Sequence, residues 1–196
     1  MFSQIYKPRY INNIYLDSIL LDHYRDSVEG ATTRTKFRIR WYGDLFGQIL
    51  NPSLEIKQKN SFLTNKQTFP VDNFILDRSF TDKTLKRTLH ESSLPAEIKT
   101  AVFSLEPVVL NRYRRAYWLS ANRKYRLTMD SEMVFHSINK TRNTFRHVCA
   151  NRVNTVVEVK YSEEDDEQLE AITNYFPFRL SRNSKYVNGI QALYEL

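Results

Sequence analysis

The sequence predicts an α+β protein whose strands form a mostly antiparallel sheet. Segments typical of strands come in runs, and segments typical of helices are grouped between them, which is the order expected for this class. With 196 residues, of which 41% are hydrophobic and 13% aromatic, the chain can bury the core of one domain. We therefore expect a single domain over residues 1–196.

The first part of the chain is expected to contain strands and one helix. Residues 9–18 are rich in β-branched and aromatic side chains, which favour a strand. Leu20, Leu21 and Tyr24 have helical spacing and predict a helix over 18–30, with Ser18 as a candidate cap and Gly30 as its end. Strands are predicted at 34–42 and 54–59, with a turn at 51–53. Residues 66–76, which include Pro70, are expected to form a loop or an irregular strand.

The second part begins with two helices and continues with long strands. A helix is predicted over 81–93, capped by Thr81 or Asp82, and another over 95–105, with Pro95 in its first turn. Strands at 107–120 and 124–137 are joined by a hairpin turn, and another strand covers 152–162. The acidic run from 163 opens a predicted helix that ends near 176, because negative charge is favourable at a helix N-terminus. A short helix is expected within 181–196.

Composition restricts the partners and the compartment. Lys and Arg number 29 against 22 Asp and Glu, a formal charge of +7, which favours a polyanion such as nucleic acid, a phosphorylated molecule or an anionic lipid surface. Cys149 is the only cysteine, so no disulfide can form within the chain and a reducing compartment is expected. No stretch reaches the ~18 apolar residues of a membrane span. These features predict a cytoplasmic protein.

The segment "TKFRIRWYG" (35–43) raises the question of which anion the protein binds. Read as a strand, it places Lys36, Arg38 and Arg40 on one face and apolar residues on the other. A single such face ordinarily just faces solvent. Other strands group charges in the same way, however, and cations on neighbouring strands about 4.8 Å apart repel each other unless an anion lies between them. Phosphate chains suit such a face, because the Arg guanidinium engages phosphate oxygens bidentately.

Three acidic residues share these charged faces, namely Glu55, Asp130 and Glu158. Carboxylates in this setting suit Mg²⁺ or Mn²⁺ that bridges to phosphate oxygens. Pairing with lysines on neighbouring strands is the alternative, and the sequence leaves both open.

Seven blocks of the sequence resemble the VTC domain, the polyphosphate polymerase domain of the triphosphate tunnel metalloenzyme (CYTH-like) superfamily. The blocks occur in the family's order over almost the whole chain: "YINNIYLDS", "RTKFRIRWYG", "LEIKQK", "PVVLNRYRRAYW", "YRLTMD", "VVEVKYS" and "SKYVNGI". The resemblance implies a closed or nearly closed tunnel of antiparallel strands with flanking helices. It also implies transfer of the γ-phosphate of ATP to a polyphosphate chain with Mn²⁺ or Mg²⁺ as cofactor.

The resemblance also implies the residues of the site. The phosphate-binding residues that it indicates are Arg38, Arg40, Lys57, Arg115, Arg126 and Lys185. Further candidates are Lys36, Lys66, Lys124, Lys160 and Arg114. Glu158 in "VVEVK" matches the metal-binding glutamate, and Glu55 and Asp130 are additional candidates for the metal. Family members carry an acidic and basic strand motif ahead of "RYINNIY", so this chain is expected to lack the first tunnel strand.

Three other functions remain open at this stage. Water could replace polyphosphate as the acceptor, which would make the protein a triphosphatase or polyphosphatase. The face could also bind polyphosphate, nucleotide or inositol phosphate without catalysis. The signatures of common nucleic-acid-binding folds are missing, so we expect no specific nucleic-acid partner. ATP, triphosphate and polyphosphate are the expected partners, together with a membrane protein that would hold the chain at the inner face of a membrane.

Overall fold

The computed structural model describes residues 1–61, 63–151, 154–162, 173–174 and 176–195. The strands are β1 (Phe2–Asp17), β2 (Thr33–Tyr42), β3 (Gly47–Ile49), β4 (Ser53–Asn60), β5 (Leu63–Pro70), β6 (Phe74–Leu76), β7 (Glu106–Ser120), β8 (Arg126–Ser137), β9 (Val148–Asn151) and β10 (Val156–Lys160). The helices are α1 (Asp22–Glu29), α2 (Asp82–Glu91), α3 (Ala96–Phe103) and α5 (Lys185–Tyr194).

Most strands belong to one antiparallel sheet with the order β10-β8-β7-β1-β2-β4-β5, and β9 pairs with β8. The centre of the sheet is β1, which pairs with β7 from Phe2 to Asp17 and with β2 from Ile11 to Leu16. The short strands β3 and β6 form a separate pair. The predicted α+β class with an antiparallel sheet is therefore confirmed.

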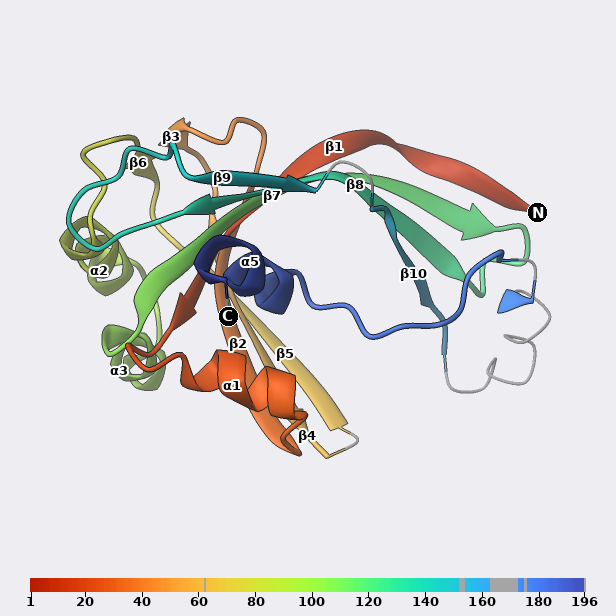
Figure 1. Cartoon of the computed structure of the whole chain (residues 1–196), viewed down its shortest axis with the longest axis horizontal. Coiled ribbons are helices and arrows are strands. Elements are labelled where there is room, and N and C mark those ends of the chain that lie inside the picture. The colour runs from red at the N-terminus through yellow and green to blue at the C-terminus, as the bar shows by residue number, and fades with distance from the viewer. Residues whose placement is uncertain (62, 152–153, 163–172, 175, 196) are drawn as a thin grey trace.

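The large sheet is strongly bent. Register shifts interrupt the β1–β7 ladder between Gln4 and Arg9, and the β7–β8 ladder is shifted beside Arg112. Such irregularities bend strands and increase their twist. In Figure 1, β4 and β5 extend below α5, whereas β10 and the start of β8 lie on the same side of the molecule as the N-terminus of β1.

The two faces of the sheet are covered by different helices. Phe37, Ile39 and Trp41 on β2 are buried in a core that also contains Leu85 of α2 and Val102 of α3. Helices α2 and α3 therefore cover this apolar face of the sheet. The opposite face carries Arg38, Arg40, Lys57 and Arg115, and we call it the inner face. One end of the inner face is filled by a second core that includes side chains of α1 and α5.

Close contacts hold α5 on the inner face. The buried Asp17, at the end of β1, accepts hydrogen bonds from the backbone N–H groups of His23 and Tyr24 at the start of α1 and from the Tyr186 hydroxyl of α5. A Cβ atom at Gly189 would lie 2.8 Å from Phe135 Cδ1, which shows how closely the helix approaches the sheet. This docking fixes Ser184 and Lys185, at the N-terminus of α5, over the inner face.

The predicted closure of the sheet into a tunnel is not confirmed. Within the described residues, β5 and β10 are the two ends of the strand order and do not pair with each other. Glu158 and Lys160 of β10 nevertheless lie close enough to Lys57 of β4 to influence its charge. The alternation pattern predicts which residues share a face, but the bulges that set the curvature of the sheet leave no clear pattern in the sequence.

Several element boundaries also differ from the predictions. Helix α1 begins at Asp22 rather than Ser18, although the Ser18 hydroxyl accepts a hydrogen bond from the Asp22 N–H. Residues 66–76 divide into the end of β5 and the separate strand β6, and β9 was not predicted. The helix expected from 163 to 176 lies largely outside the described residues. None of the described helices is long and apolar enough to span a membrane.

Candidate phosphate-binding site

Glu55 on β4 gathers three cations of neighbouring strands. Glu55 Oε2 accepts hydrogen bonds from Arg38 Nε at 2.9 Å and Nη2 at 2.6 Å, because Arg38 is its direct partner across the β2–β4 ladder. Glu55 Oε1 lies 3.0 Å from Lys66 Nζ and 3.4 Å from Arg40 Nη1. The Glu55 side chain is only 7% exposed. Burial by itself would raise the pKa of Glu55, but the attraction of Arg38 and Arg40 lowers it to about 2.

Asp130 on β8 forms a second, similar group. Arg115, its direct partner on β7, donates Nε to Oδ1 at 2.6 Å and Nη2 to Oδ2 at 2.7 Å. Lys185 of α5 places its Nζ 2.6 Å from Asp130 Oδ2. Burial opposes the charge on Asp130, yet the Arg115 hydrogen bonds and the nearby Lys185 lower its pKa overall. Helix α5 thus brings a cation to the inner face from a part of the chain far away in sequence.

Three lysines lie side by side across β2, β4 and β5. Lys57 is the ladder partner of both Lys36 and Lys66. Lys66 pairs with Glu55, and Lys36 donates a hydrogen bond to Ser184 Oγ at 2.9 Å. Among the described residues, no acid lies within ion-pair distance of Lys36 or Lys57. Burial first, and then neighbouring cations, lower the pKa of Lys36 to about 8.

Neutral side chains complete the floor of the site. The Tyr113 hydroxyl accepts a hydrogen bond from Arg40 Nη2 at 3.3 Å, and Asn13 Oδ1 accepts one from Arg40 Nε at 3.0 Å. Burial raises the pKa of Tyr113 to about 12, so its phenol remains protonated near neutral pH. We did not predict Tyr113 or Ser184 as site residues. The alternation of β7 offered a signal for Tyr113, since it places this residue on the face of Arg115.

Glu158 on β10 is the least engaged of the three candidate metal ligands. Both oxygens of Glu55 and both of Asp130 already contact cations. Glu158 is 48% exposed, and its ion pair with Lys160 has an Nζ–Oε1 distance of 3.6 Å. It also acts electrostatically on Lys57 and on Arg115, so its carboxylate is close enough to both groups of cations to influence them. For Glu55 and Asp130, the structure shows the ion-pairing alternative.

A divalent metal could be held by Glu158 together with oxygens of a bound phosphate. Within the described part of the chain, no three His, Cys, Asp or Glu residues cluster in a way that would hold a metal ion. The donor set therefore fits an ion that arrives with a phosphate ligand, because Mg²⁺ and Mn²⁺ accept a single carboxylate together with phosphate oxygens.

The remaining predicted residues lie at the edge of this group or outside it. Arg126 is exposed at the start of β8, opposite Lys160. Lys124 lies in the turn between β7 and β8. Arg114 is on the opposite face of the sheet, 3.4 Å from Glu132, so the structure does not bring it to the inner face.

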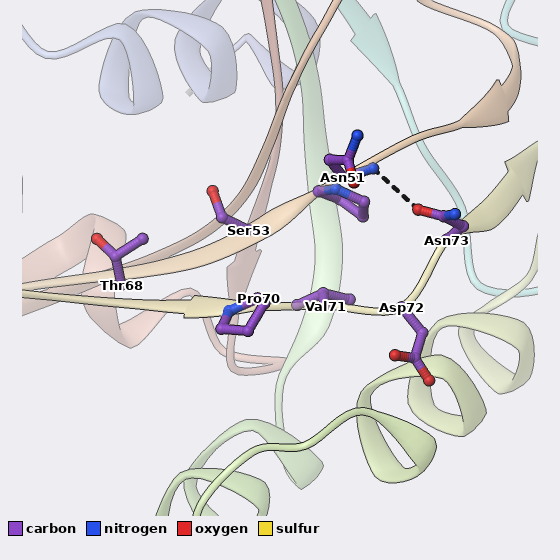
Figure 2. Close-up of a pocket in the computed structure, with 8 residues that line it drawn as sticks. Asn51, Ser53, Thr68, Pro70, Val71, Asp72 and Asn73 are labelled. Carbon is purple, nitrogen blue, oxygen red and sulfur yellow. Dashed lines mark hydrogen bonds between the residues drawn. The ribbon is translucent and has the colours of Figure 1, made fainter.

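A surface hollow of about 600 Å³ continues from the site at the ends of β4 and β5. It is lined by residues 51–53, 68 and 70–73. Ser53 and Thr68 are the ladder partners of Arg40 and Glu55, respectively, and Figure 2 shows them projecting to the same side while Asp72 points the other way. Its described lining includes no basic side chain, so the hollow borders the anion site but does not form it.

A solved structure shares this fold. A candidate adenylyl cyclase from Hippeastrum, described as having a dominant triphosphatase activity, superposes with a TM-score of 0.55 at 13% identity, over 95% of this chain and 83% of that one. A candidate adenylate cyclase from Bacillus halodurans gives a TM-score of 0.49 at 14% identity, over 97% of this chain and 94% of that one. A search of curated proteins returns no match. The family model of the VTC domain matches residues 3–194, and the chain belongs to the VTC domain family.

Proposed function

We propose that the inner face binds ATP and polyphosphate and transfers the γ-phosphate of ATP to the end of the polyphosphate chain. The observation that carries this proposal is an unbalanced group of basic side chains, which we call the cationic cluster: Lys36, Arg38, Arg40, Lys57, Lys66, Arg115 and Lys185. Five of these seven cations pair with the two buried carboxylates Glu55 and Asp130, whereas Lys36 and Lys57 pair with neither. A triphosphate supplies the negative charge that the site lacks.

The contacts within the cationic cluster also suit phosphate oxygens. Arg38 and Arg115 each present a guanidinium edge that already binds a carboxylate through two nitrogen atoms. Phosphate has a similar bidentate geometry and can share these donors. Lys57 makes no ion pair with the described residues, so it is available to a phosphate from the start.

Transfer then depends on position and charge. The bond between the γ-phosphorus and the bridging oxygen of ADP breaks, and a new bond forms to a terminal oxygen of the polyphosphate chain. The Arg and Lys side chains neutralise the charge on the transferred group and align donor and acceptor, so no protein nucleophile is required. The protonated phenol of Tyr113 provides an additional hydrogen-bond donor.

The proposed cofactor is Mn²⁺ or Mg²⁺. When bound, such an ion neutralises charge on the phosphate oxygens and polarises them. We propose Glu158 as its protein ligand, because this carboxylate lies near both Lys57 and Arg115 and is not tied to either.

Water is the second candidate acceptor, and the dominant triphosphatase activity described for the Hippeastrum protein of similar fold supports it. Incubation with ATP and Mn²⁺, followed by measurement of ADP, orthophosphate and long-chain polyphosphate, separates these functions. Long-chain polyphosphate that accounts for the ADP formed would support the polymerase. Orthophosphate in an amount equal to ADP would show instead that the protein is a hydrolase. Saturable binding of ATP without turnover would show that it binds the ligand without catalysis.

The same assay includes a matched pair of variants. Arg38→Gln removes a cation of the inner face, whereas Arg112→Gln removes one that lies over the Tyr10 ring on the opposite face. Product formation should fall at least tenfold in Arg38→Gln and stay near wild type in Arg112→Gln. Equal effects of the two substitutions would count against the inner face as the site.

A further inference from the structure

We propose that four residues beside the cationic cluster form a stacking surface for the base of a nucleoside triphosphate. These residues are Tyr6, Arg9, Tyr42 and Tyr117, and we call them the aromatic cluster. The inference rests on the proposed function and deepens it, because it concerns which triphosphates the site prefers.

Arg9 holds the aromatic cluster together. Its guanidinium carbon lies 4.2 Å from the centre of the Tyr42 ring and 5.2 Å from that of Tyr117. Arg9 Nε also donates a hydrogen bond to the Tyr117 hydroxyl at 3.2 Å. The Tyr6 ring meets Tyr117 edge to face, with 5.8 Å between ring centres. These contacts hold the rings near one another before any ligand arrives, and such preorganisation reduces the entropy lost on binding.

The aromatic cluster nevertheless remains open to solvent. Tyr6 is 63% exposed and Tyr42 is 47% exposed, while Arg9 makes no ion pair with the described residues. Three tyrosine rings around a guanidinium that makes no ion pair with the described residues present both of the flat groups on which nucleobases stack. A purely structural role would not require so much of these rings to face water.

The aromatic cluster lies where the base of a nucleotide would be if its triphosphate were bound to the cationic cluster. Arg9 is the ladder partner of Arg115, and Tyr6 is the ladder partner of Tyr117, two residues farther along β7. Tyr42 follows Arg40 by two residues, so both side chains point to the inner face and lie about 7 Å apart along the strand. A triphosphate on Arg40 and Arg115 would place its sugar and base toward Tyr42 and Tyr6.

This arrangement predicts a specific energetic signature. The cationic cluster contacts the phosphate groups, which ATP and inorganic tripolyphosphate have in common. The aromatic cluster contacts only the base, and stacking tolerates any base because each has a flat π-face. Loss of a stacking ring should therefore weaken ATP binding and leave tripolyphosphate binding unchanged.

Titration calorimetry of the full chain with ATP and with tripolyphosphate, at one Mn²⁺ concentration, tests the inference. Tyr42→Leu should weaken ATP binding roughly five- to hundredfold and change the Kd for tripolyphosphate by less than about twofold. Tyr42→Phe keeps the ring and should retain ATP affinity. Phe103→Leu, at a 70% exposed ring on α3, is the matched control and should leave both affinities unchanged.

The outcomes distinguish this inference from the proposed function. Unchanged ATP binding in Tyr42→Leu, or equal losses for both ligands, would overturn the stacking surface while tripolyphosphate binding by the wild type still supports the cationic cluster. A wild type that binds neither ligand would overturn both. The tripolyphosphate affinity of Tyr42→Leu reports whether this variant is folded.

Discussion

Glu158 on β10 lies close enough to Lys57 of β4 to stabilise its positive charge, although four strands separate these two in the order of the sheet. Burial is the main cause of the lowered pKa of Lys57, and Glu158 is the strongest influence that opposes it. The bent sheet therefore brings charges from its two ends to the same space, even though the edges do not pair. A phosphate chain on the inner face would lie between these ends.

Glu55 is expected to stabilise the ligand-free protein. Glu55→Gln keeps the shape of the side chain but leaves Arg38, Arg40 and Lys66 without their shared anion, and we expect a loss of roughly 3 kcal/mol in the free energy of unfolding. Urea denaturation measures it. Glu132→Gln, which removes the exposed partner of Arg114, should change stability by less than about 0.5 kcal/mol. Equal losses in both variants would show that Glu55 has no special role.

Acid should weaken the same interaction. The pKa of Glu55 is about 2 in the folded protein against an ordinary value of 4.5, so its contribution is complete above about pH 4.5 and is lost as the pH falls toward 2. The pKa of Asp130 is also lowered in the folded protein, so its contribution to stability is likewise lost as the pH falls. Denaturation between pH 5.5 and 3 should show a steeper loss of stability for the wild type than for Glu55→Gln. Parallel pH profiles would contradict the assignment.

Lys36 should couple triphosphate binding to proton uptake. Its pKa is about 8 in the free protein against an ordinary 10.5, and a bound polyanion favours the charged form. Above about pH 8, binding should therefore take up protons at Lys36, and affinity should fall as the pH rises. Calorimetry at pH 8.5 in buffers of different ionisation enthalpy measures this uptake. The wild type should take up more protons than Lys36→Gln, and identical values would refute the coupling.

In the ligand-free protein, the same lysine has the opposite effect on stability. The unfolded chain binds more protons than the folded one between about pH 8 and 10.5, so the contribution of Lys36 to stability rises with pH in this window. The difference in the free energy of unfolding between wild type and Lys36→Gln, measured by denaturation across this pH range, isolates the contribution of Lys36 from those of other groups.

Glu158→Gln should abolish the metal effect and preserve phosphate binding. Without metal, tripolyphosphate affinity should stay the same or rise slightly, because a negative charge near Lys57 and Arg115 is removed. With Mn²⁺, the wild type should bind more tightly, and the variant should show no such gain. Glu132→Gln on the opposite face is the control. Undiminished Mn²⁺ stimulation in Glu158→Gln would exclude this carboxylate as a ligand.

The sequence predicted the faces of the strands better than the shape of the sheet. Alternation placed Arg38 and Arg40 together because β2 is regular, with apolar residues buried on its other side. The family resemblance ranked Arg115 above Arg114, and the structure shows Arg115 on the inner face and Arg114 on the opposite face, beside Glu132. The ion pairs of Glu55 and Asp130 depend on the register between strands. Periodicity within a strand does not determine that register.

Contacts between distant segments were the least predictable. Tyr186 reaches Asp17, and Lys185 reaches Asp130, only because α5 docks on the sheet at Gly189. Spacing within the "SKY" block carries no information about that docking, and Lys185 was found through the family resemblance alone. The place of Arg9 next to Arg115 emerges only from the β1–β7 pairing, which the sequence did not predict.

Thermal unfolding of the wild type and of Arg38→Gln with increasing tripolyphosphate tests the central claim most directly. A ligand at 100 times its Kd adds about 2.7 kcal/mol of stability, which corresponds to a rise of roughly 5–10 °C in Tm for a chain of this size. We predict such a rise for the wild type, a smaller one for Arg38→Gln at the same concentrations, and none with sulfate at equal ionic strength. Equal rises with sulfate, or equal rises in the two proteins, would contradict specific triphosphate binding on the inner face.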